Sequence, residues 1–384
     1  MVQRLIGFVR EQYRTDAFIP LHAPVFAGRE REYVLETVDS TFVSSVGAFV
    51  DRFESDTAAY TGSARAVATV NGTAALHMAL MLAGVQRNEL VITQALTFVA
   101  TCNAIAYCGA EPVFVDVDRD TLGLSPVALD AWLEEHAFIN DAGLCQTRAD
   151  GKIVRACVPM HTFGHPAHLD GLVAVCARWH LTLVEDAAES LGSLYQGRHT
   201  GTFGQLGVLS FNGNKIITTG GGGMILAGAE LGARAKFLTT TAKRPHPYEF
   251  VHDEVGYNYR LPNINAALGC AQLEQLESFV ASKRALAGRY ADLFSGSAFQ
   301  FVSEPAGCRS NYWLNAVLCD SVAQRDDLLK QTNEAGVMTR PIWQLMTHLP
   351  IYAHCRAGDL RHSEWLAARV VNLPSSITAA PAGA

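Results

Sequence analysis

The sequence predicts an α/β protein with a large, mostly parallel sheet domain and a smaller α+β domain after it. Short apolar runs that fit buried strands alternate with helical runs from residue 66 to about residue 240. This alternation is typical of a parallel sheet with helices on both faces. After Thr240 a polar, aromatic and proline-bearing segment interrupts the pattern. We therefore expect an N-terminal arm and large domain at residues 1–245 and a C-terminal domain at residues 246–384.

The N-terminal segment is expected to alternate helix and extended chain. Apolar residues at helical spacing predict a short amphipathic helix that ends near Tyr13. A proline-punctuated arm follows at 18–28, and helical patterns cover 29–40 and the stretch that contains Val50 and Phe53. Charged residues interrupt the first apolar positions, so this segment lacks the continuous apolar core of a signal peptide.

Apolar runs predict the strands of the large sheet, and helical patterns lie between most of them. The predicted strands are 66–70, 90–93, 112–117, 154–160, 181–184 and 207–211. In the second region we expect one long helix at 264–294 and strand-like runs at 311–318 and 337–339. The last residues, 375–384, are expected to form a loose tail.

Composition excludes several classes of protein. Of 384 residues, 49% are hydrophobic and 17% charged, a balance that fits a globular enzyme and argues against disorder. The net charge of −7 gives no global attraction to nucleic acid or to an anionic membrane. No apolar run approaches the roughly 20 residues that span a bilayer. Nine scattered cysteines without a CxxC pair indicate reduced thiols, so we expect a cytoplasmic protein.

The stretch 181–223 carries the residues with the most distinctive chemistry. Its first strand ends in Glu185 and Asp186, at the end of a strand where open α/β sheets bind ligands. Its second strand leads to a lone lysine, Lys215, and then to four consecutive glycines. Each feature alone also fits a solvated acid, a surface lysine or a flexible turn. Their ordered combination favours pyridoxal 5′-phosphate (PLP), which needs a Schiff-base lysine and an acid for its pyridinium nitrogen.

A three-residue motif and a phenylalanine that precede this stretch are candidates for the same site. Asn71, Gly72 and Thr73 lie between a strand and a helix, where backbone N–H groups and a threonine hydroxyl can bind a phosphate. An ordinary helix cap would have the same sequence. Phe98 lies just past a strand end, where it can stack on a flat ring or fill the core.

Two positions within the stretch could complete the site. Glu189 lies three residues after Asp186 and could reach the phenolic oxygen of PLP, or it could simply favour a helix N-terminus. Ser210 precedes Lys215 by five residues and could bind the cofactor phosphate. Lys215 would then serve both as the nucleophilic amine and as the group that moves the substrate proton.

The loop MHTFGHPAHLDG offers His161, His165 and His168 as zinc ligands. Gly164 and Pro166 break the helix that would align these histidines, so we predict no metal site. The better interpretation is a pocket loop in which one histidine faces substrate. A dinucleotide site is also disfavoured, because no GxGxxG follows the first strand.

Taken together, several segments resemble the DegT/DnrJ/EryC1/StrS sugar aminotransferases in order and spacing. They are VNGTAALHMAL, ITQALTFVATCNAI, VFVDVD, EDAAESLGS, LSFNGNKIITTGGGGM and GYNYRLPNINAALG. The resemblance runs from about residue 18 to residue 374. It implies the fold type I of PLP-dependent transferases and a homodimer with PLP at the subunit interface. It also implies transamination, because Lys215 stands where a dehydratase subset of the family has histidine.

The resemblance implies a role for each matching residue. Lys215 would carry the Schiff base, and Asp186 would partner the pyridinium nitrogen. The other matching residues would bind the phosphate or the ring, and they are Gly72, Thr73, Phe98, Glu189, Ser210 and, from the other subunit, Asn258. The position of Glu189 is often glutamine in this family, which leaves the protonation state of Glu189 open.

A finer resemblance concerns the substrate. The segments that look most like the LegC-type branch are IPLHAPVF, FVSSVGAFVDRFE, HTFGHPAHLD, SFNGNKIITTGGGG and RPIWQLMTHLP. Members of this branch aminate C4 of a UDP-linked 4-keto-6-deoxy-N-acetylhexosamine, with L-glutamate as donor. The products serve bacillosamine- or legionaminic-acid-type glycans. We expect His165, Arg260 and Arg340 to bind substrate, and the loop 161–168 and segment 340–350 to form the pocket walls. The alternatives are a 3-aminotransferase, a GDP-sugar 4-aminotransferase and, more distantly, a PLP-binding regulatory protein.

Overall fold

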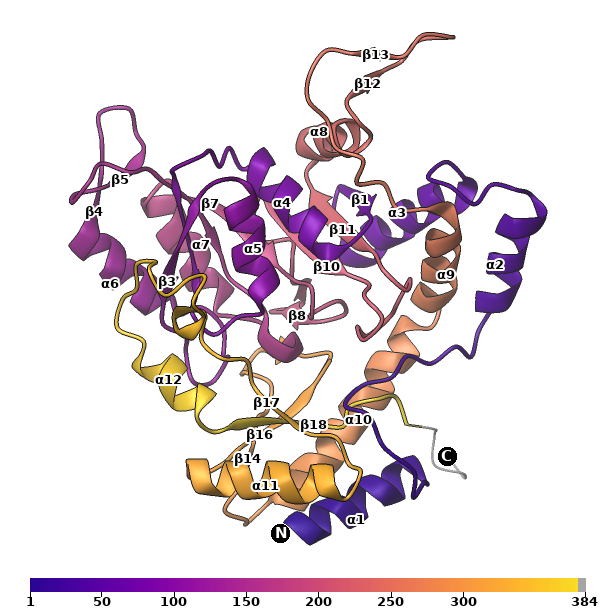
Figure 1. Cartoon of the computed structure of the whole chain (residues 1–384), viewed down its shortest axis with the longest axis vertical. Coiled ribbons are helices and arrows are strands. Elements are labelled where there is room, and N and C mark those ends of the chain that lie inside the picture. Colours follow the sequence, from indigo (N-terminus) through magenta and orange to yellow (C-terminus); the bar gives the residue numbers. More distant parts are fainter. Residues whose placement is uncertain (379–384) are drawn as a thin grey trace.

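A seven-stranded sheet forms the centre of the larger part of the computed structural model, which describes residues 1–378 (Figure 1). In spatial order its strands are β1 (Arg65–Thr69), β11 (Gly223–Ala227), β10 (Leu206–Ser210), β7 (Thr182–Asp186), β6 (Val154–Val158), β2 (Leu90–Gln94) and β3 (Glu111–Val115). The strands from β10 to β3 are parallel, whereas β11 is antiparallel to both of its neighbours. The predicted mostly parallel sheet is therefore confirmed.

Helices cover both faces of this sheet, as the apolar strands require. In β2, Val91 packs into a core with α4 (Gly72–Leu82), α5 (Val99–Tyr107) and α8 (Ala229–Thr239). Its neighbours Leu90 and Ile92 pack on the opposite face, against α6 (Pro126–His136) and α7 (Leu169–Arg178). Successive side chains of a strand point to opposite faces, so a strand that is apolar at every position must be covered on both.

A smaller antiparallel sheet lies below the large one in Figure 1. Its strands, in spatial order, are β14 (Gln300–Phe301), β16 (Asn315–Leu318), β18 (Val370–Leu373) and β17 (Arg340–Pro341). Helices α10 (Leu276–Phe294), α11 (Val322–Glu334) and the N-terminal α1 (Val2–Tyr13) share one apolar core with this sheet. The domain boundary expected at residue 245 stays a prediction. Helix α1 comes from the N-terminal part of the chain but packs with C-terminal elements.

The remaining helices connect the two sheets or flank them. Helix α9 (Asn263–Leu273) packs against α2 (Glu30–Asp39) and α3 (Ala48–Thr61), and α12 (Arg361–Ala367) precedes β18. Short elements complete the described chain: β4 (Ala137–Ile139), β5 (Cys145–Thr147), η1 (Thr162–Gly164), β8 (Leu194–Tyr195), β9 (Arg198–His199), β12 (Lys243–Arg244), β13 (Val251–His252), β15 (Cys308–Arg309) and η2 (Met346–His348). None of the helices within residues 1–378 combines the length and apolar character of a membrane span.

The structure corrects three expectations about single elements. The long helix expected at 264–294 is two helices, because α9 packs on α2 and α3 while α10 turns toward the small sheet. The sequence analysis missed β11, a fully buried strand that starts at the last glycine of the glycine run. The segment 337–339 precedes β17 and does not form part of it.

Residues 375–378 do not form the start of the expected loose tail. Ser375 is fully buried, and its hydroxyl accepts the N–H of Asn315 at 2.7 Å. The rest of the expected tail, 379–384, lies outside the described residues.

Candidate active site

A cavity of about 320 Å³ opens at the carboxyl ends of β7 and β10. Many of the residues singled out in the sequence line it, and these are Gly72, Thr73, Phe98, Asp186, Glu189, Ser210 and Lys215. Asn71, from the same motif as Gly72, and Trp343, from the expected wall 340–350, also line the cavity. Residues that the sequence analysis did not assign to the site complete the lining, and these are Leu76, Ala100, Met160, Ala188, Asn212, Asn214 and Trp313. The carboxyl ends of β6, β7 and β10 and the start of α4 thus converge on one pocket.

Asp186 is the last residue of β7 and is 3% exposed. Its carboxylate accepts a hydrogen bond from the Thr101 hydroxyl at 2.7 Å and from the N–H of Ala188 at 3.2 Å. Burial raises the pKa of Asp186, while these two hydrogen bonds and the charge of Lys215 oppose that rise. A cationic nitrogen placed against this carboxylate would therefore favour its ionised form.

Lys215 follows β10 in a tight turn, in which its N–H donates to the Asn212 carbonyl at 3.0 Å. The Lys215 side chain is 12% exposed, and its Nζ lies 3.3 Å from Oε1 of Glu189. The same nitrogen lies over the face of Trp313, 4.0 Å from the ring centroid. Trp313 is itself fixed, because its indole N–H donates to the Asn214 carbonyl at 2.7 Å. The lysine thus ends in a narrow, mostly dry space between an acid and an aromatic face.

The start of α4 and the end of β10 form a second wall of the cavity. Asn71 caps the helix, since its Oδ1 accepts the N–H of Ala74 at 2.8 Å. A Cβ atom on Gly72 would lie 3.0 Å from Cβ and 3.1 Å from Oγ of Ser210, so only glycine lets these backbones approach without displacement. The first N–H groups of a helix have no intrahelical partner and favour an anion. This wall therefore has the N–H groups and the close backbone approach that suit a phosphate, and we call it the Gly72 cradle.

Aromatic side chains form the third wall. Phe98, just before α5, is 48% exposed, and its ring centroid lies 6.2 Å from that of Trp343. Trp343 also packs against Phe163, at 5.4 Å. Trp343 belongs to the segment 340–350 that was expected to line the pocket, whereas Trp313 carried no sequence signal beyond its position in the strand-like run 311–318.

The remaining predicted site residues do not line the cavity within this chain. Asn258 is exposed in the loop before α9, where it accepts a hydrogen bond from Arg260 at 3.4 Å. Arg340 is exposed on β17. His165 is fully buried with its ring edge on Tyr312, and neither ring nitrogen has a hydrogen-bond partner among residues 1–378. Burial lowers the pKa of His165 to about 4.

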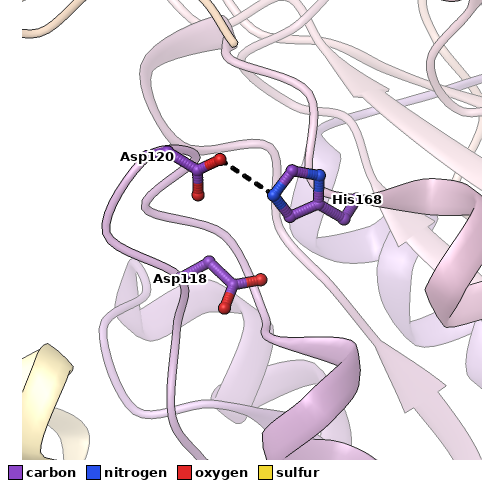
Figure 2. Close-up of side chains that lie close together, drawn as sticks. All are labelled: Asp118, Asp120 and His168. Atoms are coloured by element: carbon purple, nitrogen blue, oxygen red, sulfur yellow. Dashed lines mark hydrogen bonds and ion pairs between the residues drawn. The ribbon is translucent and has the colours of Figure 1, made fainter. Parts of the chain in front are cut away.

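The three histidines considered as zinc ligands do not converge. His161 donates from Nε2 to the buried Glu185 at 3.0 Å, and His165 packs on Tyr312. In the part of the chain that the structure describes, one group of side chains could hold a metal ion: Asp118, Asp120 and His168. Figure 2 shows them on neighbouring loops, with His168 and Asp120 joined at 2.9 Å. This group does not line the cavity.

A comparison with protein families matches residues 25–382 to the DegT/DnrJ/EryC1/StrS aminotransferase family. The chain belongs to this family. It is 37% identical over 365 residues to the putative pyridoxal phosphate-dependent aminotransferase EpsN of Bacillus subtilis (strain 168), covering 93% of this chain and 90% of that protein. It is 35% identical over 362 residues to GDP-perosamine synthase of Caulobacter vibrioides, covering 93% of each.

The fold agrees with that of solved family members. The crystal structure of a DegT DnrJ EryC1 StrS aminotransferase from Brucella abortus superposes with a TM-score of 0.82 at 29% identity and 90% coverage of each chain. The fold is therefore fold type I, as the resemblance implied. As a family aminotransferase the protein uses PLP, and the cavity fits that cofactor. It offers one enclosed lysine, two buried carboxyl groups and a glycine turn closed by Ser210.

Proposed function

We propose that the protein transfers the amino group of L-glutamate to C4 of a UDP-linked 4-keto-6-deoxy-N-acetylhexosamine. The product would be an amino sugar for bacillosamine- or legionaminic-acid-type glycans. The observation that carries the chemistry is the cavity itself, in which Lys215, Asp186 and the Gly72 cradle face one another. The substrate rests on the LegC-type resemblance of five sequence segments.

Each catalytic residue has a defined task in this reaction. PLP, when bound, supplies an electron sink for the carbanion left when an amino acid loses its Cα proton. Lys215 holds the cofactor covalently and, once displaced by the amino group of glutamate, removes that proton as a free amine. Asp186 keeps the proton on the ring nitrogen, which maintains the sink. Lys215 later returns a proton to C4 of the sugar.

The cofactor is held by the residues that the resemblance named. Gly72, Thr73 and Ser210 bind the phosphate at the start of α4, and Phe98 covers one side of the ring. We assign the last phosphate contact to Asn258 of a second copy, because Asn258 is exposed and lies outside the cavity of its own chain. The active unit would then be a homodimer with shared sites, located in the cytoplasm.

The substrate would lie outside the ring, against Trp313 and Trp343. Both aromatic faces line the cavity and exclude water from the reacting atoms. Arg260 pairs through its backbone with Thr69, close to the phosphate cradle, and we assign it to the nucleotide phosphates. Arg340 remains a candidate from the second copy. His165 is enclosed in this structure, so a role in substrate binding requires the loop 161–168 to open.

A second candidate function is amination of a GDP-linked 4-keto sugar. It is favoured by the 35% identity to GDP-perosamine synthase over 93% of both chains. The two candidates share the chemistry at C4 and differ in the nucleotide and in the group at C2 of the sugar. A 3-aminotransferase would differ in the carbon presented to the amine.

Two measurements, made one after the other, test these assignments. Borohydride reduction and peptide mapping should locate a pyridoxyl group on Lys215, and a label on any other lysine would refute the site. A panel of UDP-, GDP- and TDP-linked 3-keto and 4-keto sugars, with NMR of each product, then identifies the substrate. The highest kcat/KM on the UDP-4-keto N-acetyl sugar is expected. Preference for the GDP sugar would establish the second candidate, and preference for a 3-keto sugar would exclude both.

A further inference from the structure

Glu189 is the second buried carboxyl group of the cavity, and its two oxygens face different partners. Oε2 accepts the N–H of Phe163 at 2.9 Å, and Oε1 lies 3.3 Å from Nζ of Lys215. Asn311 fixes the backbone of Glu189, since its Nδ2 donates to the Glu189 carbonyl at 2.9 Å. The side chain is 3% exposed. Oε1 is therefore held toward the nitrogen that bonds PLP, and it cannot exchange places freely with Oε2.

The loop that binds Oε2 is held in an unusual conformation. Phe163 has φ 59° and ψ 12°, in the left-handed region that bulky L residues rarely adopt. Gly164 follows with φ 95°, where a Cβ atom would overlap Oδ1 of Asn311. An unfavourable backbone conformation that persists inside a packed fold points to a function. Here its effect is to aim one N–H at Glu189.

The charges around Glu189 change when PLP binds. Within the described residues, the charged groups that act on Glu189 are Lys215 and Asp186. While Lys215 is an ammonium ion, it balances the Glu189 carboxylate. The bond to PLP removes that free ammonium and brings the phenolic oxygen of the ring next to Glu189. An ionised Glu189 would then face an electron-rich oxygen in a site with little water, which is unfavourable.

We propose that Glu189 takes up the proton that Lys215 loses on binding PLP and then donates a hydrogen bond from Oε1 to the phenolic oxygen. This inference rests on the proposed function. One proton passes from the Lys215 ammonium to the Glu189 carboxylate. The resulting amine adds to the aldehyde carbon of PLP. A carbon–nitrogen double bond forms, and the aldehyde oxygen leaves as water with the two amine protons.

The environment of Glu189 favours this protonation once the ammonium is gone. Burial raises the pKa of Glu189, the neighbouring Asp186 adds to the rise, and Lys215 and the Phe163 N–H oppose it. Loss of the Lys215 charge removes one of the opposing effects. Glu189 is thus a positioning residue with two states, a counter-ion in the free protein and a hydrogen-bond donor in the loaded one.

Glutamine is the informative substitution, because an amide has the shape of a protonated carboxyl group. The Phe163 N–H must bind the amide oxygen, so the NH₂ group of a Glu189→Gln variant would point toward the phenolic oxygen. A Glu189→Met variant keeps the length of the side chain and removes the donor. Glu54→Gln is a matched control outside the cavity, since Glu54 also binds a lysine, Lys236, at 2.7 Å and a backbone N–H at 2.8 Å.

The direct test is an infrared difference spectrum of the protein with PLP minus the protein without it. We expect the carbonyl stretch of a protonated carboxyl group to appear on loading in wild type and in Glu54→Gln, and to be absent in Glu189→Gln and Glu189→Met. Absence of the band from wild type overturns the proposal without any variant. Retention of the band in both Glu189 variants also overturns it, because another carboxyl group then carries the proton.

PLP affinity gives a second, independent readout. The dissociation constant of Glu189→Gln should stay within about threefold of wild type, and that of Glu189→Met should rise by about tenfold or more, since one hydrogen bond is lost. Equal weakening in both variants contradicts a donor role for Glu189. Failure of the proposed function is distinguishable, because a protein without PLP on Lys215 fails the peptide map before any spectrum is compared.

Discussion

The hydroxyl of Thr101 donates a hydrogen bond to Oδ2 of Asp186 at 2.7 Å, between residues 85 positions apart in the chain. Thr101 lies in the first turn of α5 and Asp186 at the end of β7, and both are buried. The bond favours the ionised carboxylate, against the burial that raises the pKa of Asp186. Thr101 therefore supports the carboxylate that we propose as the partner of the cofactor ring nitrogen.

Thr101→Val should lower kcat/KM by about tenfold or more, because a hydrogen bond to a charged group contributes roughly 1.5–3 kcal/mol. The variant should still bind PLP, since Lys215 and the phosphate cradle are unchanged. Thr57→Val is the matched control, because the buried Thr57 hydroxyl has no hydrogen-bond partner among residues 1–378. Steady-state kinetics with glutamate check the prediction. Equal rates for the two variants would show that Thr101 does not act through Asp186.

Asp186→Asn should retain PLP and lose most of its activity. An amide cannot hold a proton on the ring nitrogen by charge, so the carbanion loses its stabilisation. The glutamate half-reaction, followed by the absorbance of the bound cofactor, measures the effect without a sugar substrate. Activity within about threefold of wild type, less than about 1 kcal/mol in the barrier, would refute the role given to Asp186.

The residues that sequence reasoning found share one property: they sit next to element boundaries that the apolar pattern marks. Asp186 and Ser210 are the last residues of β7 and β10, and Gly72 starts α4. The carboxyl ends of neighbouring parallel strands meet at one edge of a sheet, so these side chains converge. The motif spacing was therefore enough to place them in one pocket.

The residues that sequence reasoning missed reach the pocket from distant elements. Trp313 comes from the loop before β16 of the small sheet, and Thr101 reaches Asp186 from α5. Such contacts depend on how distant elements pack together, which no local pattern encodes. The break between α9 and α10 has the same origin, because the apolar periodicity continues through it while the packing partner changes.

The proposed homodimer predicts that two severely impaired variants restore each other. Lys215→Ala removes the reactive amine, and Asn258→Ala removes a phosphate contact that we assign to the second copy. In a hybrid dimer one of the two sites has both residues intact, so mixing should recover activity well above that of either variant alone. Subunit exchange is confirmed separately with differently tagged chains. Exchange without recovery would show that each site is built from a single chain.

Lys283 predicts an unusual dependence of stability on pH. It is fully buried on α10 and donates hydrogen bonds to the carbonyls of Trp313, at 3.1 Å, and Ser375. Burial lowers the pKa of Lys283 to about 7, whereas an unfolded lysine titrates near about pH 10.4. Between these values Lys283 binds one proton more in the unfolded chain than in the folded chain, so its contribution to the free energy of unfolding should rise with pH across this window.

Urea unfolding at a series of pH values from about 7 to about 10 measures how the free energy of unfolding changes per pH unit. One group can contribute up to about 1.4 kcal/mol per pH unit to this slope. Lys283→Met should lose this contribution, because the variant lacks the side chain that is protonated in this window only when the chain is unfolded. Lys236→Met is the matched control, since Lys236 is partly exposed and bonds Glu54. The control should keep the slope of wild type. A slope in Lys283→Met as steep as in wild type would show that Lys283 does not titrate in this way.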